Sequence, residues 1–70
     1  ECFVEFQLQK GGALRILLTD IAGRRREVYK SIVGTGKQSI ALSLRDIPPG
    51  TYFVRVETER EHFSGRLVVR

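Results

Sequence analysis

Residues 44–56 of the chain read LRDIPPGTYFVRV, and this stretch decides the fold. Pro48, Pro49 and Gly50 interrupt a β-ladder, because proline lacks an amide proton and glycine frees the backbone. Tyr52 then begins a segment in which every second residue is apolar. A leucine, a Pro-Gly corner and a tyrosine entering a strand are typical of a tyrosine corner, in which the phenol donates to the backbone a few residues upstream. The stretch therefore predicts that the chain passes from one β-sheet to another at this point.

Apolar residues alternate with polar ones along most of the remaining chain. No window has the i, i+3, i+4, i+7 spacing of an amphipathic helix, whereas period-two alternation is typical of half-buried strands. The first strand is expected to turn Cys2, Val4, Phe6 and Leu8 toward the core. Six strands are predicted in all, at residues 2–9, 14–19, 25–33, 40–44, 51–57 and 63–70.

Turn-forming residues separate the predicted strands. Gly11-Gly12 and residues 34–37 are each expected to close a β-hairpin, since glycine supplies the positive φ that such turns need. Residues 20–23 and 58–61 are expected to form polar turns. Short strands separated by turns predict an all-β fold: a small immunoglobulin-like antiparallel β-sandwich with Greek-key features and about six to seven strands.

Length and cysteine content restrict the possible functions. Seventy residues form one small domain, and a core of this size rarely contributes more than ~3–5 kcal/mol. A substrate cleft of ~300–1,000 Å³ is hard to build from so little core, so an enzyme is not expected. The single Cys2 excludes an internal disulfide and a thiolate metal cage, and no cofactor is expected. No stretch approaches the ~18 apolar residues of a membrane-spanning helix.

The net charge of +4 and the pI near 9.8 would suit nucleic acid, anionic lipid or acidic polysaccharide as a partner. Arg24, Arg25 and Arg26 form the one basic run, and strand alternation puts Arg24 and Arg26 on one face and Arg25 on the other. Charges on this segment favour an edge strand. Only Tyr29 could stack on a base near the run, so no nucleic acid is expected.

Two patterns that elsewhere carry chemistry are incomplete in this chain. Residues 34–39 resemble a phosphate-binding loop, but Ser31 stands where that motif needs its first glycine and Gln38 follows Lys37. Cys2 and His62 are each the only residue of their type and lie at opposite ends of the sequence. A core cysteine and a solvated histidine are therefore expected, not a nucleophilic pair.

Taken in order, several segments resemble the C-terminal sorting domain of the type IX secretion system, a family found in Bacteroidetes. The resemblance rests on residues 20–24 (DIAGR), 42–44 (LSL), 47–52 (IPPGTY) and the ending 65–70 (GRLVVR), and it covers nearly the whole chain. Two features depart from the family pattern: an Asn-Pro segment before the first strand is absent, and Arg25 and Arg26 stand where an apolar residue often follows. By resemblance the motif positions are Asp20, Gly23, Arg24, Gly50, Tyr52, Leu67, Val68, Val69 and Arg70.

The resemblance implies that residues 1–70 are the non-catalytic C-terminal sorting signal of a larger secreted protein. Such a signal directs its cargo through the periplasm and across the outer membrane, to the medium or the cell surface. In many members a sortase-like peptidase then removes the domain and joins the cargo to an anionic lipopolysaccharide. The implied partners are the outer-membrane translocon, its shuttle proteins and that peptidase.

Other interpretations remain open at this point. A fibronectin-III-like adhesion module could carry the same corner, although such modules usually have ~100 residues, seven strands and a core tryptophan. The turn and corner residues could also act in sorting only by maintaining the shape of the domain. The last strand is the better candidate for direct recognition, through edge pairing or capture of the terminal carboxylate. An open edge could also pair with a second copy of the chain.

Overall fold

The computed structural model describes residues 2–70, with only the backbone described for Cys2, and contains six strands and no helix within that range. The predicted all-β class is confirmed. The fourth strand ends two residues earlier than expected, because Leu44 already belongs to the corner. The strands are β1 (Cys2–Leu8), β2 (Gly12–Asp20), β3 (Arg25–Val33), β4 (Gly36–Leu42), β5 (Gly50–Thr58) and β6 (His62–Val69).

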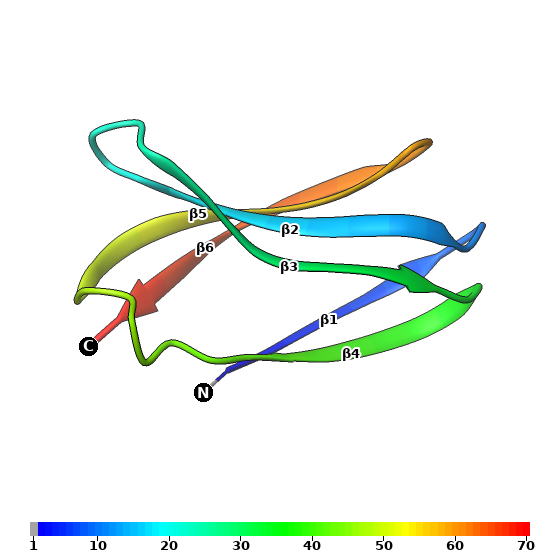
Figure 1. Ribbon diagram of the computed structural model, residues 1–70, viewed down its shortest axis with the longest axis horizontal. Coiled ribbons are helices and arrows are strands. Elements are labelled where there is room, and N and C mark those ends of the chain that lie inside the picture. The colour runs from blue at the N-terminus through cyan, green and yellow to red at the C-terminus, as the bar shows by residue number, and fades with distance from the viewer. Residues whose placement is uncertain (1) are drawn as a thin grey trace.

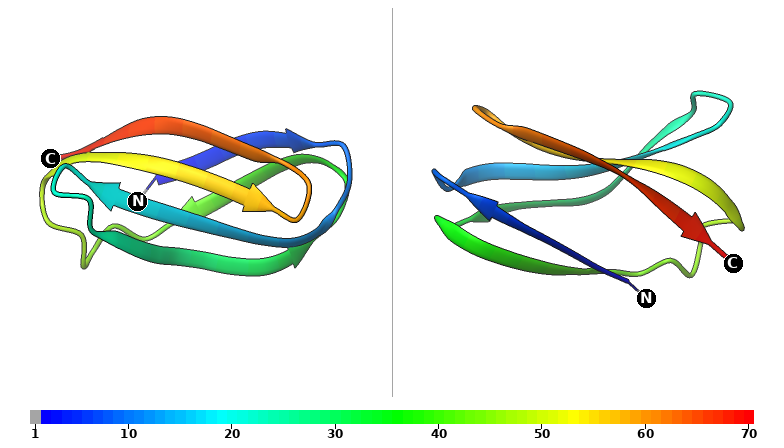
Figure 2. Two further views of the ribbon diagram at one scale, coloured as in Figure 1. Left: turned by 90° about the horizontal axis from the view of Figure 1, so that it is seen from above. Right: turned by 180° about the vertical axis from the view of Figure 1, so that it is seen from behind.

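The strands form two antiparallel sheets packed face to face. One sheet has the order β3-β2-β5-β6 and the other pairs β1 with β4. Figure 1 shows the four-stranded sheet above the two-stranded one, and Figure 2 shows the layers from two further sides. Strands β2, β5 and β6 are arranged like strands C, F and G of immunoglobulin domains, with β3 added beside β2. The predicted small sandwich is therefore confirmed.

Two connections predicted as hairpins instead cross between the sheets. The predictions at Gly11-Gly12 and at residues 34–37 were wrong, because β1 pairs with β4 and β2 pairs with β3 and β5. The β1–β2 and β3–β4 connections contact each other, because the Gly11 amide donates to Thr35 Oγ1 at 3.1 Å. A Cβ at Gly11 would lie 2.5 Å from the Val33 carbonyl oxygen. Glycine is therefore needed at position 11 for close approach, and not for a hairpin turn.

The remaining connections agree with the predictions. Residues 20–25 join β2 to β3 and residues 58–62 join β5 to β6, and each connection closes a hairpin within the four-stranded sheet. Residues 43–49 carry the chain from β4 to β5 and so from one sheet to the other, as the Pro-Gly corner predicts. The charged strand β3 is an edge strand, which confirms that prediction too.

The core lies between the two sheets. Strands β2 and β5 contribute its upper side and β1 and β4 its lower side, and six buried side chains form one cluster. Burying each of them on folding favours the native state by roughly 1.5–3 kcal/mol before the loss of chain entropy is counted. The cluster comprises Leu8, Leu14, Ile16, Ile40, Leu42 and Val56.

Candidate recognition site

The turn between β2 and β3 is organised by the carboxylate of Asp20. One of its oxygens, Oδ1, accepts hydrogen bonds from the amides of Ala22 and Arg24, both at 2.9 Å. The other, Oδ2, accepts from Arg24 Nε at 2.9 Å. Gly23 adopts a φ of 87°, which favours glycine over any residue with a Cβ. The sequence Asp-x-x-Gly-Arg therefore specifies this turn locally.

These contacts also set the protonation of Asp20. The Arg24 amide is the largest single influence holding the pKa of Asp20 below its ordinary value, and the Ala22 amide and the Arg24 guanidinium act in the same direction. Each of these groups stabilises the charged form of the carboxyl. The Asp20 carboxylate is therefore ionised at neutral pH, and both of its oxygens accept hydrogen bonds within the turn.

The corner before β5 has the predicted hydrogen bond. The Tyr52 hydroxyl donates to the carbonyl oxygen of Pro48 at 2.5 Å, which confirms the tyrosine corner. Ile47 is buried, and its amide donates to the Leu44 carbonyl at 3.1 Å. A chain that changes sheets leaves backbone groups without ladder partners, and these two hydrogen bonds satisfy three of them.

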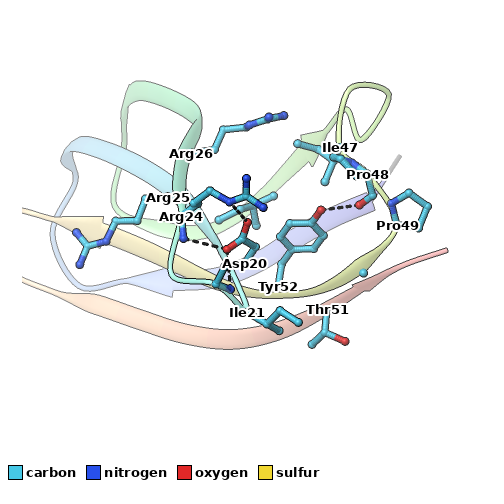
Figure 3. A pocket seen from close by; sticks show the side chains of 13 residues that line it. Asp20, Ile21, Arg24, Arg25, Arg26, Ile47, Pro48, Pro49, Thr51 and Tyr52 are labelled. Atoms are coloured by element: carbon cyan, nitrogen blue, oxygen red, sulfur yellow. Dashed lines mark hydrogen bonds and ion pairs between the residues drawn. The ribbon is translucent and has the colours of Figure 1, made fainter.

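The turn and the corner are distant in the sequence but meet at one end of the sandwich. Asp20 and Tyr52 are directly paired across β2 and β5, and Tyr52 is in turn paired with Leu67 of β6. A cavity of about 480 Å³ lies between the turn and the corner, and Figure 3 shows the side chains that line it. We call this end of the molecule, made by residues 20–26, 47–52 and 67–70, the recognition end.

Strand β6 brings the last residues of the chain to the same end. Val68 is paired with Thr51 and Val69 with Gly50. Leu67 and Val69 are half-buried, whereas Val68 and the following Arg70 are exposed. All nine sequence-predicted positions thus belong to the recognition end, although they come from three separate parts of the sequence.

One contact at this end was missed in the sequence. Arg26 donates from a guanidinium nitrogen to the carbonyl oxygen of Asp46 at 2.9 Å, which ties β3 to the corner. Arg24 is paired with Asp20, whereas Arg25, which also lines the cavity, points away from Asp20 and Tyr52 (Figure 3). The basic run is therefore split as the alternation predicts, and two of its three members are already bonded within the domain.

The other sequence features lie away from this end or carry no site. His62 begins β6 at the far end and is exposed, as expected, and the side chain of Cys2 lies outside the described part of the chain. Among the described side chains, those of residues 3–70, no group of three or more His, Cys, Asp or Glu could hold a metal ion. The same residues include no helix long and apolar enough to cross a membrane.

Comparison with known proteins gives one match. The family model for the secretion system C-terminal sorting domain matches residues 2–70. No curated protein and no solved structure matches the chain. The adhesion-module alternative rested on the tyrosine corner, which both kinds of domain share, so the match over the whole described chain decides between them. The chain belongs to the family of type IX secretion system C-terminal sorting domains.

Proposed function

We propose that the recognition end is the part of this sorting signal that the secretion machinery contacts. The observation that supports the proposal is the convergence of the Asp20 turn, the Tyr52 corner and the end of β6 on one small surface. A folded signal must present features that its receptor can distinguish from other β-sandwiches. Here the β2–β3 turn, the corner before β5 and the end of β6 provide such a combination, because strand pairing places them side by side at one end of the domain.

Strand β6 is the element best suited to direct contact. It is an edge strand, so one side of its backbone has no ladder partner within the described residues. Such an edge can accept a strand from another protein through main-chain hydrogen bonds, and a chain end can be captured through its carboxylate. The turn and the corner hold β5, and through it β6, in position, and exposed side chains such as Ile21 complete the contact surface beside β6.

Deletion of residues 67–70 tests the role of the terminal strand. A reporter protein fused to the chain should reach the surface of a Bacteroidetes host that has type IX secretion, whereas the shortened fusion should remain in the periplasm. Circular dichroism and resistance to protease must show that the shortened domain still folds. Normal export of a folded, shortened fusion would contradict the proposal.

A second pair of fusions separates the two modes of contact. Ten polar residues added after Arg70 leave β6 intact but move the terminal carboxylate, and the same ten residues inserted in the β5–β6 turn, at the far end, serve as the control. Carboxylate capture predicts loss of export only for the first fusion. Edge pairing predicts export of both, together with the loss caused by the deletion.

Later processing of the cargo is part of the same proposal. The domain is the terminal part of a larger secreted protein, crosses the periplasm with it, and is removed by a sortase-like peptidase that joins the cargo to an anionic lipopolysaccharide. The domain itself takes no catalytic part. In support of this role, several polar groups at the recognition end are bonded within the domain: the Asp20 carboxylate to Arg24, and the Tyr52 hydroxyl to the Pro48 carbonyl oxygen.

A further inference from the structure

The outer face of the four-stranded sheet gathers cations that are scattered in the sequence. The register places Lys30, Arg15 and Glu57 in one row across β3, β2 and β5. Arg55 lies opposite Leu17 in the next row. In the row after that, Arg25 is paired with Thr19, and Phe53 with Arg66. Paired residues share a face, so these side chains all lie on the side away from the core.

The charge on this face is strongly asymmetric. Five cationic side chains lie on it, and the register adds only two carboxylates, Glu27 and Glu57. Glu57 is occupied by two of the cations: Arg55 Nε donates to its Oε2 at 2.7 Å, and Arg15 donates to its Oε1 at 2.5 Å. The Arg55 and Arg15 hydrogen bonds hold the pKa of Glu57 below its ordinary value, so this pairing persists at neutral pH. The cationic residues of the face are Arg15, Arg25, Lys30, Arg55 and Arg66.

The other outer face has no such excess. On the β1–β4 sheet, Glu5 and Lys37 balance each other, and the other outward side chains that the structure describes there are uncharged. One outer face is therefore positively charged and the other is close to neutral, although both are exposed. Most of the net positive charge of the chain lies on the outer face of the four-stranded sheet.

Apolar side chains stand among the cations. Phe53 is 54% exposed and has Arg66 directly across from it, and Val68, also 54% exposed, follows Arg66 on the same side of β6. Leu17, on the same face, is only 8% exposed, so its neighbours cover it. Phe53 is thus not covered by another strand, and an exposed aromatic residue in a basic face is typical of a contact surface.

We propose that this outer face of the β3-β2-β5-β6 sheet binds the surface of an anionic lipid membrane, with Phe53 and Val68 entering the headgroup region. The cations would lie at the level of the lipid phosphates, where each Lys or Arg strengthens partition by about fivefold. Arginine and lysine stems can also lie along apolar surface while their charged ends reach the headgroups. This face overlaps the recognition end at Arg25 and Val68, but its other four cations, at positions 15, 30, 55 and 66, lie outside that end. The proposal therefore goes beyond the sorting contact.

Lipid fits the face better than the other anionic polymers. Nucleic acid binding would require several stacking aromatics, and Phe53 is the one aromatic side chain that the register places among the cations. A soluble acidic polysaccharide would use the cations but gives no reason for Val68 to be exposed beside them. A membrane interface accepts both the apolar side chains and the cations at once.

Two single substitutions provide the most direct test. The chain has no tryptophan, so Phe53→Trp and Phe3→Trp each introduce a single indole probe. The two phenylalanines lie on opposite outer faces and are similarly exposed, at 54% and 65%. With vesicles of phosphatidylglycerol and phosphatidylcholine (3:7), the emission of Phe53→Trp should shift to the blue and that of Phe3→Trp should not. Vesicles of phosphatidylcholine alone should shift neither.

Charge reversal tests the electrostatic part with a matched control. The double substitution Arg25→Glu with Arg66→Glu should lower the partition coefficient onto anionic vesicles, measured by co-sedimentation, more than tenfold. Lys10→Glu with Lys37→Glu makes the same change in net charge away from this face and should lower it far less. Raising the salt concentration to 0.5 M should weaken the binding of the unsubstituted chain. Thermal unfolding of each variant confirms that it is folded.

Several results would overturn the proposal. These are equal spectral shifts for the two tryptophan variants, equal losses for the two charge-reversal pairs, or no binding to the anionic vesicles. Binding to polygalacturonate with no spectral shift at position 53 on vesicles would assign the face to a polysaccharide and exclude the lipid.

Discussion

Asp20 and Tyr52 are cross-strand partners, Asp20 as the last residue of β2 and Tyr52 as the third residue of β5. Each is also the residue that fixes its own connection: Asp20 closes the β2–β3 turn and Tyr52 closes the β4–β5 corner. The pairing therefore links two local structures into one surface. The end of β6 joins them because Leu67 is the next partner in the same row.

Removal of the Tyr52 hydroxyl should destabilise the domain without unfolding it. Tyr52→Phe loses the hydrogen bond to the Pro48 carbonyl, and a lost hydrogen bond of this kind costs about 1 kcal/mol. Urea unfolding measures the change. Tyr29→Phe is the matched control, because the Tyr29 hydroxyl makes no hydrogen bond within residues 2–70, and it should change stability by less than ~0.5 kcal/mol. Equal losses for the two variants would contradict the role given to the corner.

A methyl group at Gly23 should cost about 1 kcal/mol, because its φ of 87° lies in a region that disfavours residues with a Cβ. Gly65→Ala is the comparison, since a Cβ there would meet nothing within 4 Å and the backbone needs no positive φ. Alanine lowers the entropy of the unfolded chain, so Gly65→Ala should leave the domain as stable or slightly more stable. The midpoints of thermal unfolding distinguish the two. Equal destabilisation would show that the turn does not depend on Gly23.

The contribution of Asp20 should depend on pH. Its pKa is lowered in the folded state, so the stability that it contributes is present above the ordinary value of 3.8 and is lost as the pH falls below that value. Asp20→Asn should therefore unfold more easily than the unsubstituted chain at pH 7, and the difference should shrink between pH 4 and pH 2. Urea midpoints of both proteins across this range provide the measurement. A difference that is constant with pH would mean that the charge on Asp20 plays no part.

Local features of this fold were predictable, whereas strand pairing was not. Alternation identifies which side of a strand is buried, and the Asp20 turn and the Tyr52 corner are built from residues close in sequence, so each could be predicted. Gly11 was misassigned because alternation does not reveal which strand is the partner of which. A three-residue connection can close a hairpin or cross between sheets, and tertiary packing decides between these outcomes.

The same limitation applies to the surfaces. The nine motif positions could be named from the resemblance, but their convergence depends on the register of β2, β5 and β6. The cationic face had no sequence signal, because Arg15, Lys30 and Arg66 are far apart until the sheet aligns them. The hydrogen bond from Arg26 to the Asp46 carbonyl could not be predicted from the sequence either, since every residue has a backbone carbonyl.

A matched pair of surface substitutions tests most directly whether the recognition end is read during sorting. Ile21, at that end, is 84% exposed, and Ile32, at the far end of β3, is 83% exposed, so lysine at either position should leave folding unchanged. Surface export of a reporter fusion should fall at least tenfold for Ile21→Lys and remain at the unsubstituted level for Ile32→Lys. Normal export of both folded variants, or equal loss for both, would contradict recognition at this end.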